Sequence, residues 1–140
     1  MLSLVLATVY AGRIGQPLYC STPDAPRYYD TAYSPWLALP IEHYQDGRVQ
    51  CGDLFYVRFP DGSTLMARAY DAGPFASYCV RQPDGSCPAI GVDVPEHLWP
   101  VEDLSAFVEM YNISAAHRAS WTGSDRLPPQ RSGPVQGDGM

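Results

Sequence analysis

The residues best suited to chemistry are two aspartates, each placed beside a strand-like segment. Asp71 lies in the segment YDAGPF (70–75), and Asp93 lies in the segment IGVDV (90–94). A carboxyl group that is half buried at the end of a strand can have a raised pKa and exchange a proton near neutral pH. Structural roles stay open at this point. An aspartate before Gly-Pro often forms a turn, and Asp93 also fits an ordinary exposed position.

A predicted β-hairpin leads into Asp71. Side chains alternate in character along residues 54–59, which is typical of a half-buried strand. The sequence PDGS at 60–63 favours a turn, and residues 64–70 form the expected partner strand. Asp71 is therefore expected where the chain leaves the second strand of this hairpin.

A short apolar segment orients Asp93. Side chains alternate across a strand, so Val92 and Val94 are expected to point into the core and Asp93 to the opposite face. Residues 95–99 follow as one predicted helical turn with Pro at its first position.

The first ten residues are predicted to form a strand. They are apolar enough to suggest a signal peptide, but they have no basic n-region and a poor cleavage pattern. We therefore expect a strand with Leu2, Leu4 and Leu6 on one face. Residues 12–33, which are rich in Pro, Gly and Tyr, are expected to form a long loop.

Two further segments are predicted strands, at 36–41 and 106–113. The first is a short apolar run that begins at Trp36. The second alternates, but it also fits a short helix that begins near Asp103. The strand is the preferred interpretation of 106–113.

The four cysteines predict two disulfides. Cys79 and Cys87 enclose a PDG turn, so a local bridge between them is expected, which leaves Cys20 to pair with Cys51. Such bridges indicate an oxidising, extracellular or cell-wall-facing location. Four free buried thiols are the alternative. No C-x-x-C spacing is present, so a metal site is not expected.

Composition limits the partners. The chain has 140 residues, enough for one domain, with nine basic and fifteen acidic side chains and no Lys/Arg cluster. Nucleic-acid binding is therefore not expected. No apolar run is long enough to span a bilayer. Residues 1–121 are predicted to be the folded domain. Residues 122–140 are predicted to be a Pro/Gly-rich tail that contacts other copies or subunits.

Together these segments resemble a known family. The ATVY strand (7–10), CGD (51–53), the hairpin, DAGPF (71–75) and the later GVDV (91–94) occur in the order found in double-psi β-barrel domains. The resemblance covers roughly residues 5 to 113. It extends to expansins, barwin-like proteins, rare lipoprotein A and the so-called 3D domain of lytic transglycosylases. It implies a mainly β fold, a closed barrel of six strands with two crossing psi loops, with short helical turns.

The resemblance also implies roles for particular residues. Asp93 corresponds to the essential acid/base, and Asp71 to the carboxylate beside it, so the two carboxyl groups are expected within about 10 Å. Thr8 and Tyr10 are expected to line the groove, and Tyr70 and Tyr78 are candidate platforms for stacking sugars. These four are the candidate substrate-binding residues. No cofactor is implied.

Two functions follow from these expectations. The first is binding of a cell-wall glycan polymer such as peptidoglycan, with or without cleavage like that of a lytic transglycosylase. The second is a non-enzymatic structural or decorating module of an assembly, for example a phage virion. The first function needs an open groove. The second predicts a groove blocked by the Cys79–Cys87 loop or by a neighbouring chain, and a tail packed on another chain. Asp93 held in a salt bridge beneath that loop would also favour the second function.

Overall fold

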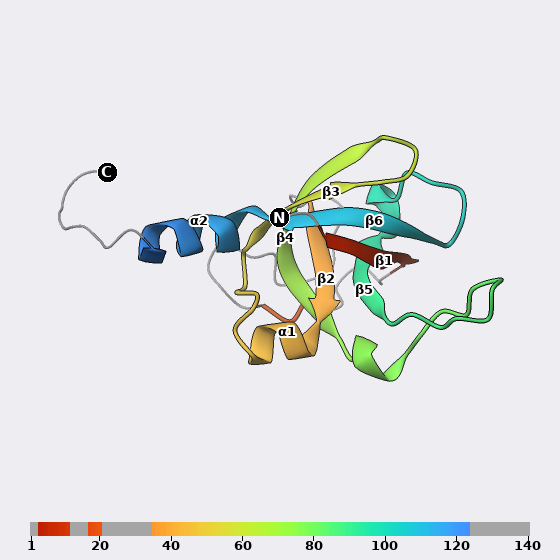
Figure 1. The fold of residues 1–140 in the computed structure, drawn as a ribbon, viewed down its shortest axis with the longest axis horizontal. Helices are drawn as coiled ribbons and strands as arrows, with labels where there is room; N and C mark the ends of the chain where they lie inside the picture. The colour runs from red at the N-terminus through yellow and green to blue at the C-terminus, as the bar shows by residue number, and fades with distance from the viewer. Residues whose placement is uncertain (1–2, 12–16, 21–34, 124–140) are drawn as a thin grey trace.

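The structure, a computed structural model, describes residues 3–11, 17–20 and 35–123, which form a closed barrel followed by a helix (Figure 1). The strands are β1 (Ser3–Tyr10), β2 (Trp36–Pro40), β3 (Leu54–Arg58), β4 (Thr64–Gly73), β5 (Ile90–Pro95) and β6 (Ser105–Asn112). The helices are α1 (Ile41–Gln45) and α2 (Ile113–Gly123), with 3-10 turns η1 (Phe75–Ser77) and η2 (Glu96–Leu98). The predicted mainly β fold is confirmed.

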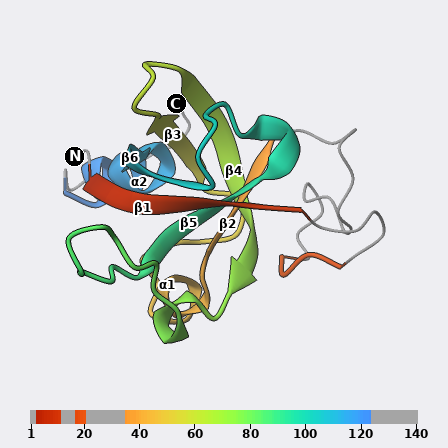
Figure 2. The same ribbon diagram turned by 90° about the vertical axis from the view of Figure 1, so that its right-hand side faces the viewer.

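The order of strands around the barrel is β1-β5-β2-β4-β3-β6. The pairs β1/β5 and β2/β4 are parallel, and the other neighbours are antiparallel. Figure 2 shows β1, β5 and β2 beside one another on one side of the barrel. Parallel neighbours require long crossover connections, which interleave the two halves of the chain. This closed, mixed barrel confirms the predicted six-stranded double-psi architecture.

The barrel interior is filled by alternate side chains of every strand. Phe55 and Val57 of β3 are buried there, as are Val92 and Val94 of β5. The predicted alternation in the hairpin and in β5 is thus confirmed. Asp93 lies between two inward-pointing valines and therefore faces outward.

Strand β1 places its leucines on the outside of the barrel. Val5 and Ala7 pack against the core, whereas Leu4, on the other face, is 69% exposed. Leu6 follows Leu4 on that outer side but is buried. The face of β1 that contributes to the barrel core therefore carries Val5 and Ala7 and is opposite the face that carries the leucines. Leu2 lies outside the described residues.

The C-terminal part of the chain contains a helix that the sequence did not predict. Residues 105–112 form a strand, as preferred over a helix beginning near Asp103, and α2 follows directly. Arg118 of α2 donates two hydrogen bonds, of 2.6 and 2.9 Å, to the buried carboxylate of Asp53. Ser114 Oγ accepts a hydrogen bond from the Leu54 N–H at 2.9 Å. These contacts attach α2 to the barrel next to β3.

Both predicted disulfides are present. Cys20 is bonded to Cys51, and Cys79 is bonded to Cys87. No helix among the described residues is long and apolar enough to cross a membrane. Residues 122 and 123 of the predicted tail (122–140) are the end of α2. Residues 124–140 lie outside the described residues, so the contacts of the tail with other copies or subunits stay a prediction.

Candidate functional site

The two aspartates lie on either side of β2 at the same level of the barrel. Ala38 of β2 is in register with Asp71 of β4 and with Asp93 of β5. Neighbouring strands lie about 4.8 Å apart, so the two aspartate Cα atoms are separated by roughly 10 Å. The flanking residues Leu37 and Leu39 point into the core, so Ala38 faces outward and forms a small floor between the carboxyl groups.

Asp93 is partly buried and has one side-chain donor. The Thr8 hydroxyl, on the neighbouring parallel strand β1, donates a hydrogen bond of 2.6 Å to Asp93 Oδ1. Burial raises the pKa of Asp93 to about 6, and the negative charge of Asp71 raises it as well, although the Thr8 bond acts in the opposite direction. Asp93 therefore changes its protonation state near neutral pH, as a general acid/base requires.

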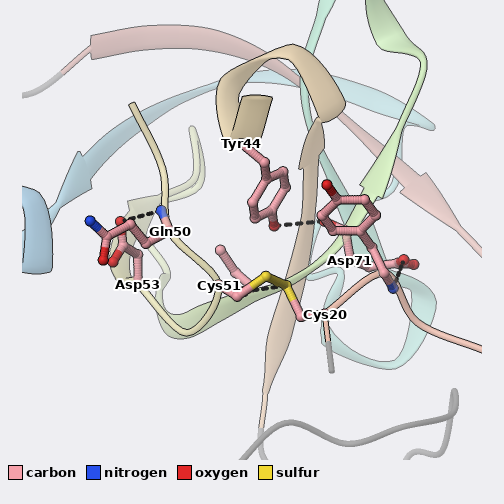
Figure 3. Close-up of a disulfide and its surroundings, with 8 residues drawn as sticks. Cys20, Tyr44, Gln50, Cys51, Asp53 and Asp71 are labelled. Atoms are coloured by element: carbon pink, nitrogen blue, oxygen red, sulfur yellow. Dashed lines mark hydrogen bonds between the residues drawn. A yellow bond between two sulfur atoms is a disulfide. The ribbon is translucent and has the colours of Figure 1, made fainter. Parts of the chain in front are cut away.

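Asp71 is more deeply buried and has several donors (Figure 3). The Tyr19 backbone N–H donates to Oδ1 at 3.1 Å, and the Tyr10 hydroxyl makes a longer contact of 3.4 Å with Oδ2. Burial raises the pKa of Asp71, while hydrogen bonds from the backbone of Ala72 and Tyr19 and from the Tyr10 hydroxyl lower it. Burial thus raises the pKa of both carboxyl groups.

The side chains of Trp36, Tyr44 and Tyr19 contact Asp71 or the groups that bind it. Trp36 Nε1 donates to the Tyr10 hydroxyl at 2.9 Å, and the Tyr44 hydroxyl donates to the Asp71 carbonyl oxygen at 2.8 Å. The rings of Tyr19 and Tyr44 lie 5.0 Å apart between centroids. Sequence reasoning assigned no role to these side chains. The abundance of Tyr near position 19 was the only available signal.

The four predicted groove residues divide into two groups. Thr8 and Tyr10, which were expected to line the groove, contact the aspartates, and Tyr78 is 59% exposed. Tyr70 is only 4% exposed, since it packs against the Trp36 side chain in a second apolar cluster. The expectation that Tyr70 is a sugar platform is wrong for this reason, because a buried ring presents no face to a ligand.

The loop closed by Cys79 and Cys87 extends away from the barrel (Figures 1 and 2). A bridge between Cys79 and Ala89 and a hydrogen bond from Gln82 N to Ser86 O make it a narrow hairpin with an exposed tip. Among the described residues, Asp93 takes part in no salt bridge. The arrangement expected of a purely structural module, with Asp93 paired beneath this loop, is therefore not found in the described part of the chain.

The described residues contain no group of three or more His, Cys, Asp or Glu side chains placed to hold a metal ion. The site consists instead of two carboxyl groups, hydroxyl donors and the backbone N–H groups of Tyr19 and Ala72. Such a set can bind hydroxylated ligands by hydrogen bonds and can transfer a proton.

Comparison with known proteins gives structural matches. No family model matches the chain, and no curated protein sequence matches it. A crystal structure of apo Clavibacter michiganensis expansin superposes with a TM-score of 0.52 at 15% identity, covering 92% of this chain and 54% of that one. An aspartate-to-asparagine mutant of the same expansin, in complex with cellohexaose, gives a TM-score of 0.51 at 16% identity, covering 81% and 50%. This chain spans about half of those structures.

Proposed function

We propose that this chain, which has the same expansin-like double-psi β-barrel fold as those structures, binds a cell-wall polysaccharide along the outer face of β1, β5, β2 and β4. We further propose that Asp93 transfers a proton to or from the bound glycan. The observation that carries the proposal is the partly buried Asp93 carboxyl, with a pKa of about 6, hydrogen-bonded to Thr8 beside a second buried carboxyl. The cellohexaose bound to the structural neighbour supports the choice of ligand class.

The proposed cleavage step needs only one group that acts as both acid and base. Protonated Asp93 donates its proton to the glycosidic oxygen as the bond from that oxygen to C1 breaks. The 6-hydroxyl of the same sugar then attacks C1 and returns its proton to Asp93, which gives a 1,6-anhydro sugar end and consumes no water. The usual pair of glycosidase carboxylates is not required in this scheme. Asp71 stabilises the protonated form of Asp93 through its negative charge.

Exposed aromatic and hydroxyl groups would provide the binding contacts. Tyr78 offers an exposed ring for a sugar face, and Tyr10 offers a hydroxyl beside the Asp71 carboxylate. The two disulfides support an oxidising working environment, such as the cell exterior. A secreted or wall-facing location is therefore part of the proposal.

Binding and cleavage can be tested separately on the full chain. Binding of cellohexaose is measured by NMR chemical-shift changes. Binding of insoluble cellulose and of purified peptidoglycan is measured by co-sedimentation. Cleavage is measured by mass spectrometry of the soluble fragments, in which anhydro ends are diagnostic. The variant Asp93→Asn keeps the shape and the acceptor for Thr8 but cannot carry the proton. Asp103→Asn, at an exposed position, is the matched control.

Each outcome decides one part of the proposal. Anhydro products from the wild type and Asp103→Asn, but not from Asp93→Asn, support proton transfer by Asp93. Binding that persists in all three proteins without any product supports the binding function and removes the catalytic step. Absence of binding to every glycan offered removes the proposed function altogether. Asp71→Asn is expected to have a smaller effect on turnover than Asp93→Asn.

A further inference from the structure

The donor that reaches Asp71 from residues 17–20 belongs to the backbone, so its position depends on how this segment is held. The segment contains no helix or named strand. It lies on the outer side of β4, where the Cys20 N–H donates to the Tyr70 carbonyl oxygen at 2.9 Å and Leu18 packs into the apolar cluster beside Tyr70. This places the Tyr19 N–H on Asp71 Oδ1 at 3.1 Å.

The other end of the disulfide is in a rigid turn. Gly52 has φ of +91°, which favours glycine, and its N–H donates to a carbonyl oxygen of β4 at 2.8 Å. The Gln50 N–H donates to Asp53 Oδ2 at 3.0 Å, and Arg118 of α2 holds the same carboxylate. Cys51 is thus fixed to the barrel from both sides (Figure 3).

We propose that the Cys20–Cys51 disulfide is a positioning element of the candidate site, which holds the Tyr19 N–H on Asp71 and keeps water away from that carboxylate. Cys20 and Cys51 are thirty-one positions apart in the chain, and the bond fixes the segment of Cys20 to the turn of Cys51. Tyr19 contributes in a second way, because its ring contacts Tyr44, whose hydroxyl binds the Asp71 carbonyl oxygen. Cys20 and Tyr19 are positioning residues and act through Asp71.

The proposal predicts how Asp71 responds when the segment is changed. The titratable groups that face Asp71 are Tyr10, Tyr19, Tyr44 and Asp93. Burial is the largest influence on the pKa of Asp71 and raises it, and the Tyr19 N–H lowers it. Release of the segment should admit water and lower the pKa of Asp71. Loss of the N–H alone, with the segment in place, should raise the pKa of Asp71.

The first experiment compares disulfide variants of the full chain. The pKa of Asp71 is measured from the pH dependence of its side-chain carboxyl ¹³C signal in the wild type and in Cys20→Ser/Cys51→Ser. Cys79→Ser/Cys87→Ser, which removes the other bridge, is the control. A lower pKa for Asp71 in Cys20→Ser/Cys51→Ser alone is expected. An unchanged or higher pKa in that folded variant would overturn the proposal.

A second pair of variants leaves the disulfide intact and also decides the question if the first variant does not fold. Tyr19→Pro removes the N–H and the ring, whereas Tyr19→Ala removes the ring but keeps the N–H. We expect a higher pKa of Asp71 in Tyr19→Pro than in Tyr19→Ala, by a shift well outside the fitting error. Equal pKa values in the two variants would show that the N–H does not act on Asp71.

The importance of this positioning for glycan chemistry rests on the proposed function, but its measurement uses no glycan. If the pKa of Asp71 is unchanged in both pairs of variants, the positioning role is refuted, but glycan binding by the wild type is not. Conversely, a chain that binds no glycan can still show the predicted shifts. The two failures are therefore distinguishable.

Discussion

Asp93 should reduce the stability of the fold at neutral pH, and Asp93→Asn should remove this cost. The pKa of Asp93 rises from 3.8 to about 6 on folding, chiefly because the carboxyl is buried. Between these two pH values the folded protein keeps a proton that the unfolded chain has lost. The fold is therefore not destabilised by Asp93 below about pH 4, where the carboxyl is protonated in both states. It loses stability as the pH rises to about 6, the pKa of the folded state. At about 1.4 kcal/mol per pH unit, the difference reaches at most about 3 kcal/mol.

The asparagine variant isolates this effect because it keeps nearly the same shape. Its amide oxygen can still accept the Thr8 hydrogen bond, but no charge is buried. Asp93→Asn should exceed the wild type in free energy of unfolding by as much as about 3 kcal/mol at pH 7, and by less than about 1 kcal/mol at pH 4. Urea unfolding followed by tryptophan fluorescence at pH 4, 5, 6 and 7 measures both quantities.

The Asp53 carboxyl does not confound this comparison. Asp53 has a lowered pKa and changes stability in the opposite sense, but it is present in both proteins. Asp103→Asn, at an exposed position, should follow the wild type at every pH. A free energy difference between Asp93→Asn and the wild type that is the same at pH 4 and pH 7 would refute burial of the Asp93 charge, and with it the basis for acid/base chemistry.

Two further predictions use the same methods. Thr8→Val removes the donor that lowers the pKa of Asp93, so the carboxyl ¹³C titration should give an Asp93 pKa above that of the wild type, and an equal value would contradict the role of Thr8. Arg118→Ala leaves the buried Asp53 carboxylate without its guanidinium and should cost about 3 kcal/mol of unfolding free energy in urea. Arg48→Ala, which breaks an exposed pair, should lower the free energy of unfolding much less than Arg118→Ala, and equal losses would contradict the burial argument.

The strands could be predicted from the sequence because their signal is local. Each strand of the hairpin alternates between core and surface, and the PDGS turn between them needs no distant partner. The outward direction of Asp93 follows from Val92 and Val94 in the same way. The register that places Ala38 between the two aspartates is a property of the whole barrel and was not predicted. The family resemblance implied only that the two carboxyl groups lie close together.

The errors arise where the pattern is interrupted by tertiary structure. The register between β2 and β4 shifts, so that Leu37 pairs with Ala69 but Ala38 pairs with Asp71. Tyr70 therefore has no partner in this register and packs beneath Leu18 and the disulfide, a position that alternation cannot reveal. The helix α2 was missed for a similar reason, because the contact of Arg118 with Asp53 joins residues sixty-five positions apart.

Backbone donors are the part of the site that residue types cannot reveal. Every residue except proline carries an N–H, so the sequence around Tyr19 gives no reason to place that group on Asp71. The position of the N–H is set by the Cys20–Cys51 bond, which was predicted only as the pairing that remains once Cys79 is paired with Cys87. The contribution of Tyr19 thus depends on the fold around it more than on its own side chain. Substitutions at Tyr19 that keep the N–H should therefore shift the pKa of Asp71 less than Tyr19→Pro does.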